Sequence, residues 1–297
     1  MPTRQTNDWP YLRRKALEEA EALAIWSNSG RLPTCVRRIA EMRLVREIRF
    51  RPLLSEGTIS IGDDGFAISV GADTYEVEDL QTRFRDDSTG KRLPHRLRFT
   101  LAHEIAHTFF FDLNSRPPKN KVHLENPRTL HALEMACNTI AGGLLLPKEI
   151  FERRFAGKSL HDPDTLSKIA NTAHMSKPAL ISRLAKLGSS TLPPAIFASV
   201  RRKGHELVIE AVWRHYSFHA MFSELKAGAP LQFQGVSMQC LKPLQIYGGS
   251  FCKVSFDVSL DTRVSDRWKL SAESAADTVT SHAFIVTLTR PRDFGEG

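Results

Sequence analysis

Residues 103–107 read His-Glu-Ile-Ala-His and combine side chains that bind metal ions with one that can move a proton. Because an α-helix turns by about 100° per residue, His103 and His107 would lie one turn apart on the same helix face. Their two imidazoles could share one divalent cation, and Glu104 could take a proton from a water molecule beside it. The alternative is a buried helix that carries two incidental histidines.

The residues around this motif favour a half-buried helix. Between residues 93 and 113, apolar side chains recur at every fourth position, at Leu97, Leu101, Ile105 and Phe109. This spacing marks one buried face, and Pro94 stands where a first helical turn tolerates proline. The two histidines would therefore be flanked by apolar residues, as a half-buried metal site requires.

A third metal ligand is expected on the following helix. Asn126 can cap it, Pro127 fits its first turn, and Pro147 ends it. Its apolar stripe consists of Leu130, Leu133, Cys137, Ile140, Ala141 and Leu144. Glu134 borders this stripe, where a carboxylate is costly unless it is paired or bound to a metal. The alternative is an ordinary glutamate that faces solvent.

Two stretches resemble the ImmA/IrrE family of bacterial metallopeptidases. They are R-F-T-L-A-H-E-I-A-H (98–107) and E-M-A-C-N-T-I-A-G-G-L-L-L-P (134–147). The resemblance implies that Zn²⁺, or alternatively Mn²⁺, is held by His103, His107 and Glu134, and that Glu104 is the catalytic base. It also matches Asn138 to a family asparagine near the ligands. Gly142-Gly143 replaces better helix formers, which predicts a loose helix end.

The fold expected from the resemblance is α+β, a zincin-like core in which a small sheet packs on two metal-binding helices. The family's substrates imply a protein partner, a helix-turn-helix repressor of the xenobiotic-response-element type. Cleavage of that repressor would change transcription of a stress-response or mobile-element operon. The peptidase domain is expected to span residues 1–160.

Helices are predicted over residues 11–27, with Leu12, Ala16, Leu23 and Trp26 on the apolar side, and over residues 34–43. Strands are predicted over 45–52, 57–61 and 65–71. The last strand, which contains Phe66 and Ile68, is expected at the sheet edge, where it would pair with the substrate backbone. His131 is either a donor to the reacting carbonyl oxygen or a plain surface histidine, and so is His123.

Two connecting segments could contact the substrate. Residues 72–92 are rich in charge and would form either a lid or a disordered insertion, and we favour the insertion. Residues 114–125 join the two metal helices, and their length and position predict a loop at the mouth of the site.

The C-terminal half differs from the N-terminal half in its pattern of apolar and polar residues. Residues 161–190 have the rhythm of a helix-turn-helix, with Ser176 as the cap of the second helix. Direct DNA contact by Lys177, Ser182, Arg183 and Lys186 is one interpretation. The favoured one is a helical pair that packs against the peptidase core or docks the substrate. Residues 191–297 are predicted to form a β-rich domain. The family resemblance implies a GAF-like sensory domain at this point, and the size and strand content agree with it.

Composition is compatible with a cytoplasmic bacterial enzyme. The net charge is +8, and the basic residues between Arg13 and Arg51 alternate with acidic ones, as solvated helix faces do. The chain shows no signal peptide and no apolar run near the ~20 residues that span a bilayer, so no membrane partner is expected. Four scattered cysteines are expected to be reduced. The main rival function is a DNA-binding regulator that uses the peptidase fold as a scaffold, and a toxin or antitoxin role is a third.

Overall fold

The computed structural model describes residues 9–85, 92–122, 127–155, 158, 163–187, 195–203, 206–214, 227, 252–256, 269–276 and 282–289. The chain forms two compact units, the first with Met1–Arg154 and Ala170–Arg183 and the second with Phe155–Ile169 and Leu184–Gly297. The predicted helical segment 161–190 is therefore shared between the two units. Among the described residues, no helix has the length and hydropathy to cross a membrane.

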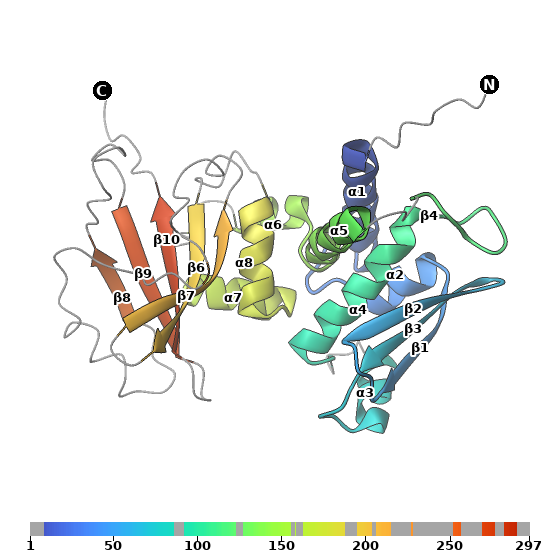
Figure 1. Cartoon of the computed structure of the whole chain (residues 1–297), viewed down its shortest axis with the longest axis horizontal. Helices are drawn as coiled ribbons and strands as arrows, with labels where there is room; N and C mark the ends of the chain where they lie inside the picture. Colours follow the sequence, from blue (N-terminus) through green and yellow to red (C-terminus); the bar gives the residue numbers. More distant parts are fainter. Residues whose placement is uncertain are drawn as a thin grey trace. The chain divides into compact units, whose positions relative to one another are not determined.

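The first unit is α+β, as the sequence predicts (Figure 1). Its elements in chain order are α1 (Trp9–Ser27), α2 (Val36–Met42), β1 (Val45–Arg51), β2 (Gly57–Gly62), β3 (Gly65–Gly71), α3 (Val77–Arg85), α4 (His95–His107), the 3₁₀ helix η1 (Thr108–Phe110), β4 (Phe111–Asp112), β5 (Lys119–Asn120), α5 (Pro127–Leu145) and α6 (Lys148–Phe155). The helix pair α7 (Pro163–Ala173) and α8 (Lys177–Lys186) follows.

The three-stranded sheet has the order β1-β3-β2, so β3 is the central strand. It pairs in parallel with β1 and antiparallel with β2. The prediction that the strand with Phe66 and Ile68 lies at the edge is therefore wrong. Both side chains are fully buried, because Phe-Ala-Ile-Ser-Val is a nearly continuous apolar run, which suits a strand covered on both sides. β2 is the edge strand that lies next to α4.

Residues 77–85 are neither a lid nor a disordered insertion. They form α3, which packs beside β1 and buries Leu80 completely. Gln81 also donates a hydrogen bond to the carbonyl oxygen of Ile48 in β1. The charged residues of α3 misled the prediction because they cover only its solvent side, while residues 86–91 lie outside the described part.

α4 lies between the sheet and α5, and α1 packs on α5 (Figure 1). The buried face of α1 consists of small residues, Ala16, Ala20, Ala24 and Ser27, whereas Trp26 is exposed, contrary to the predicted apolar side. In α5, Leu130 is also exposed, but the rest of the predicted stripe is buried.

The glycine pair in α5 serves close packing and does not loosen the helix. α5 continues through Gly142 and Gly143 to Leu145. A Cβ at Gly143 would lie 2.7 Å from Leu17 Cδ1 of α1, and one at Gly142 would lie 3.2 Å from Arg183 Cδ of α8. The absence of a side chain therefore lets both helices approach α5.

α7 and α8 form the predicted helix pair. His174 begins the turn between them with a positive φ, and the Ser176 hydroxyl accepts a hydrogen bond from Ala179 N, as expected of the cap. Arg183, however, is 3% exposed, pairs with Glu21 of α1 and donates to the carbonyl oxygen of Leu146. Arg183 is therefore part of the packing with α1 and α5 and is not available to a DNA phosphate.

The second unit contains a five-stranded antiparallel sheet of order β7-β6-β10-β9-β8. Its strands are β6 (Ala195–Lys203), β7 (Glu206–Arg214), β8 (Cys252–Phe256), β9 (Lys269–Ala276) and β10 (His282–Thr289). The β-rich prediction fits this sheet. Within residues 191–297 the sequence pattern predicts strands over 196–201, 207–213, 240–246, 252–259 and 283–288. Of these, 240–246 lies outside the described residues, and β9 is a strand that the pattern does not predict.

Candidate metal centre

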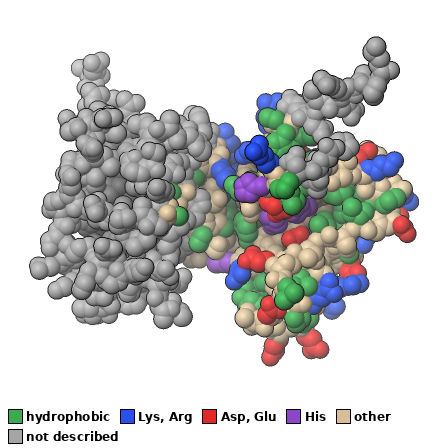
Figure 2. Space-filling model, in the orientation of Figure 1, with side chains coloured by type: hydrophobic (Ala, Val, Ile, Leu, Met, Phe, Trp, Pro, Cys, Tyr) green, Lys and Arg blue, Asp and Glu red, His purple; other side chains and the backbone are tan. Residues whose placement is uncertain are grey.

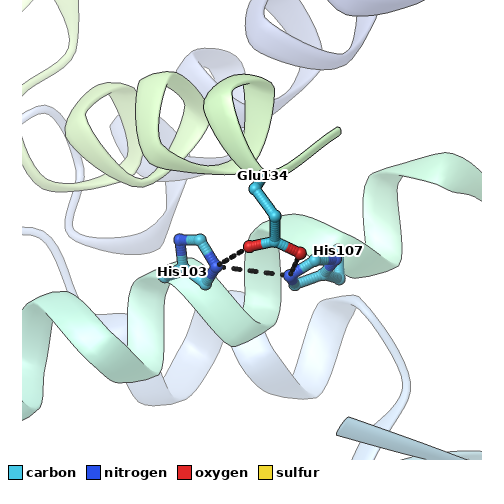
Figure 3. A group of neighbouring side chains, drawn as sticks. All are labelled: His103, His107 and Glu134. Atoms are coloured by element: carbon cyan, nitrogen blue, oxygen red, sulfur yellow. Dashed lines mark hydrogen bonds and ion pairs between the residues drawn. The ribbon is translucent and has the colours of Figure 1, made fainter. Parts of the chain in front are cut away.

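Three predicted ligands meet at one point between α4 and α5. His103 and His107 project from the last turns of α4, and Glu134 of α5 reaches between them (Figure 3). Glu134 Oε2 lies 3.1 Å from His103 Nε2, and Glu134 Oε1 lies 3.6 Å from His107 Nε2. The two Nε2 atoms are 3.3 Å apart. One ligand atom from each residue lies within 4.8 Å of the other two, which is a compact set of donors.

The donor set fits a catalytic metal ion. Two imidazoles and one carboxylate are the ligands of many zinc peptidases, and three protein ligands leave a fourth position open. Burial, followed by the neighbouring His103, lowers the pKa of His107 to about 4, so its ring is neutral at pH 7 and has a lone pair to donate. On the face of the first unit drawn in Figure 2, histidine side chains lie at the surface next to acidic side chains.

Asn138 orients His103. Its Oδ1 atom lies 3.0 Å from His103 Nδ1, one turn of α5 beyond Glu134. Because this oxygen accepts the Nδ1 proton, the lone pair of His103 is placed on Nε2, which faces Glu134. The contact gives a physical role to a residue that the sequence marked only by resemblance.

Glu104 follows His103 on α4 and is 7% exposed. Burial, and secondarily the Glu134 carboxylate, raises the pKa of Glu104 to about 7. A carboxyl group with a pKa near neutrality can both accept and return a proton. Burial also raises the pKa of Cys137, so this thiol is an inert part of the α5 packing.

The start of β2 closes over Glu104. A Cβ atom built on Gly57 would lie 2.6 Å from Glu104 Oε1 and 2.9 Å from its carboxyl carbon. Only glycine therefore allows the strand to pass this close to the carboxylate without displacing it. Sequence reasoning missed Gly57, because nothing in its neighbourhood of the chain shows that Glu104 lies opposite.

Arg43 was also missed, because it was grouped with the solvated basic residues. It is 5% exposed and donates to both the hydroxyl and the carbonyl oxygen of Thr108, directly after α4. Its guanidinium carbon lies 4.2 Å from the centre of the Phe109 ring, and Glu19 pairs with it. A cation at this point stabilises the C-terminal end of the helix that carries both histidines.

The remaining predicted site residues do not join the cluster. His131 is exposed on α5, and no hydrogen bond links it to the three ligands in the described part of the chain. Phe66 and Ile68 belong to the core beneath α4, as described above. His123 and Asn126 lie outside the described residues.

Comparison with known proteins relates part of this chain to a family of metallopeptidases. Residues 92–185 match the family model of the IrrE N-terminal-like domain, Peptidase_M78. A stretch of 108 residues is 32% identical to the radiation response metalloprotease IrrE of Deinococcus deserti, covering 35% of this chain and 36% of that relative. A solved Mycobacterium tuberculosis transcriptional regulator has a similar fold, with a TM-score of 0.52 and 16% identity over 93% of this chain and 75% of that one.

Proposed function

Because residues 92–185 match the family model of the IrrE N-terminal-like domain, we propose that this chain is a metal-dependent endopeptidase of the ImmA/IrrE family that cleaves a protein substrate. The observation that supports this most strongly is the meeting of His103, His107 and Glu134 next to a buried Glu104. The proposed cation is Zn²⁺, with Mn²⁺ as the alternative. When bound, such an ion would acidify a water molecule and polarise the carbonyl group of the substrate.

Glu104 is the proposed proton carrier of the reaction. Its carboxylate accepts a proton from the attacking water and then gives it to the departing amine. The raised pKa suits both steps, because the carboxyl group releases the proton about as readily as it takes it. Asn138 keeps His103 in the ligating orientation, and burial keeps His107 neutral.

β2 is the proposed docking strand for the substrate backbone. Among the described residues, its second edge has no partner strand, and Gly57 places its start beside Glu104. An extended peptide could add to this edge through main-chain hydrogen bonds. A cavity of about 230 Å³ lies beside the residues that precede β2 and could take a substrate side chain, with walls that include Leu54, Glu56, Tyr75, Arg96 and Thr100.

The proposed substrate is a helix-turn-helix repressor, by analogy with the ImmA/IrrE family. Its cleavage would serve a stress response or the control of a mobile element. The sheet of the second unit is then a candidate sensory domain. A second candidate function is a DNA-binding regulator, which the fold of the M. tuberculosis transcriptional regulator supports, whereas the buried position of Arg183 does not favour it.

The decisive experiment replaces Glu104 by Gln, which keeps the shape but removes the proton acceptor. We expect unchanged metal content and a loss of cleavage of at least about 10²-fold, the usual contribution of a general base. Cleavage is measured by mass spectrometry on a peptide library and on any helix-turn-helix repressor found to be encoded beside the gene. Glu18→Gln, at an exposed ion pair of α1, is the control.

The peptide library and the repressor together distinguish a wrong substrate from a wrong catalytic mechanism. Activity on the library without cleavage of the repressor would keep the peptidase and reject its proposed substrate. Wild-type rates in Glu104→Gln would overturn the proposed chemistry itself. Specific DNA binding without any peptidase activity would favour the second candidate function.

A further inference from the structure

A second cavity, of about 530 Å³, lies apart from the metal ligands. Its walls come from the end of α1, the loop after it, α2, the last residue of α3, and Arg92, which precedes α4. None of the candidate metal ligands lines it, and neither does Glu104. The cavity is therefore a separate feature of the first unit.

The lining of this cavity is strongly basic. Among the described residues it includes one acidic side chain, Glu41, and five arginines, Arg31, Arg37, Arg38, Arg85 and Arg92. Five positive charges less one negative charge leave a formal excess of four. Glu41 accepts a hydrogen bond of 2.9 Å from Arg37 Nε, so its charge is already engaged. Like charges around a common space repel one another, and a bound anion would relieve that repulsion.

Two of these arginines form hydrogen bonds to backbone carbonyl oxygens and still have further N–H donors for a ligand. Arg37 donates to the carbonyl oxygen of Arg85, and Arg38 donates to that of Ser27. A guanidinium group has five N–H donors, so these bonds fix the side chains and leave further donors. The Nε atom of Arg92 is buried and has no hydrogen-bond partner among the described residues. A ligand oxygen would satisfy this donor, which is costly to leave unpaired.

The size and shape of the cavity favour a small ligand. Its volume falls within the roughly 300–1,000 Å³ of small-molecule sites. Guanidinium groups bind phosphate oxygens in pairs of hydrogen bonds, which makes arginine the usual partner of phosphoryl groups. Leu32, Pro33 and Cys35 add an apolar wall for an uncharged part of the ligand.

We propose that this cavity binds a small phosphorylated molecule that carries two or more negative charges. The site is independent of the peptidase chemistry, since it shares no residue with the metal centre. Its ligand belongs to a class that includes nucleoside diphosphates and other diphosphate esters, for which inorganic pyrophosphate is the simplest probe.

The test is calorimetric titration of the full chain with pyrophosphate, in buffer free of phosphate and sulfate. We expect saturable binding with one equivalent per chain. Arg31→Gln and Arg92→Gln should each weaken it at least about tenfold, the effect of losing one charge-assisted hydrogen bond. Arg31 is exposed, so its replacement should leave the fold unchanged, and circular dichroism checks this.

Arg14→Gln is the matched control, because it removes the same charge from an exposed position of α1 that does not line the cavity. Equal weakening in Arg14→Gln, or no saturable binding in the wild type, would overturn the proposal. Removal of the metal by pyrophosphate would affect all variants alike and so cannot imitate the expected pattern.

One further outcome would replace the proposed ligand. Tighter, Arg31-dependent binding of a single-stranded oligonucleotide than of pyrophosphate would assign the cavity to nucleic acid.

Discussion

At the scale of single residues, Asn138 determines which nitrogen of His103 faces the metal position. Asn138→Ala removes the oxygen that lies 3.0 Å from His103 Nδ1. We expect metal affinity to fall by about 10–100-fold, the usual effect of losing such a partner. Competition with a fluorescent chelator measures this affinity. Asn138→Asp, which keeps an acceptor, should retain most of it, and equal losses in both variants would argue against the orienting role.

Gly57 affects the position of Glu104 because its missing side chain leaves room for the carboxylate. In Gly57→Ala, the new Cβ would lie 2.6 Å from Glu104 Oε1, so the carboxylate must move. A displacement of about 1 Å at a reacting group can cost roughly 10²-fold in rate. We therefore expect peptidase activity to fall by that order while metal content stays constant.

Gly62→Ala provides the control for this prediction within the same strand. Its Cβ would meet only the carbonyl oxygen of Gly65, at 3.8 Å, which is ordinary contact. Activity and metal content should both remain near wild type. If the two alanine variants behave alike, the proximity of Gly57 to the proton carrier has no catalytic importance.

At the scale of elements, the spacing of apolar residues in α8 is typical of a DNA-reading helix, but its Arg183 is buried in the core. Arg183→Leu breaks the buried pair with Glu21 and leaves that carboxylate with the backbone N–H of Lys148 but no cationic partner among the described residues. We expect the free energy of unfolding to fall by about 3–5 kcal/mol, measured by urea denaturation. Arg14→Leu, at an exposed pair, should cost less than about 1 kcal/mol. A stable Arg183→Leu protein with weakened DNA binding would restore the DNA-reading interpretation.

At the scale of the whole molecule, every residue of the candidate metal centre belongs to the first unit. His103, His107, Glu134, Asn138 and the strand β2 all lie within it. A chain that ends after residue 192 should therefore still bind about one equivalent of metal, as metal analysis would show. Its activity on short peptides should remain, while recognition or regulation of the protein substrate is lost.

The physical risk in this truncation is newly exposed apolar surface, which circular dichroism and light scattering would detect as misfolding or aggregation. A well-folded, metal-loaded but inactive product would mean that the second unit completes the active site. That result would reject the assignment of catalysis to the first unit alone.

The sequence by itself predicted the three side chains that meet at the candidate metal centre. His103, Glu104 and His107 are one helical turn apart, so their relative positions follow from local geometry that any α-helix imposes. Glu134 could be predicted because a carboxylate at the border of an apolar stripe needs a partner. The longer helices and strands of the first unit followed from periodicity, except α3 and α6, whose polar composition concealed their buried faces. The short elements η1, β4 and β5 were not predicted either.

Only the tertiary structure decided which strand has a free edge, because strand order depends on pairing between distant segments. It also decided that Arg43 and Arg183 are buried, since the helices that cover them lie far away in the sequence. The same holds for Gly57 opposite Glu104 and for Gly142 and Gly143 beneath α8 and α1. The sequence records each residue's chemistry and its local spacing, but long-range packing alone determines what each side chain faces.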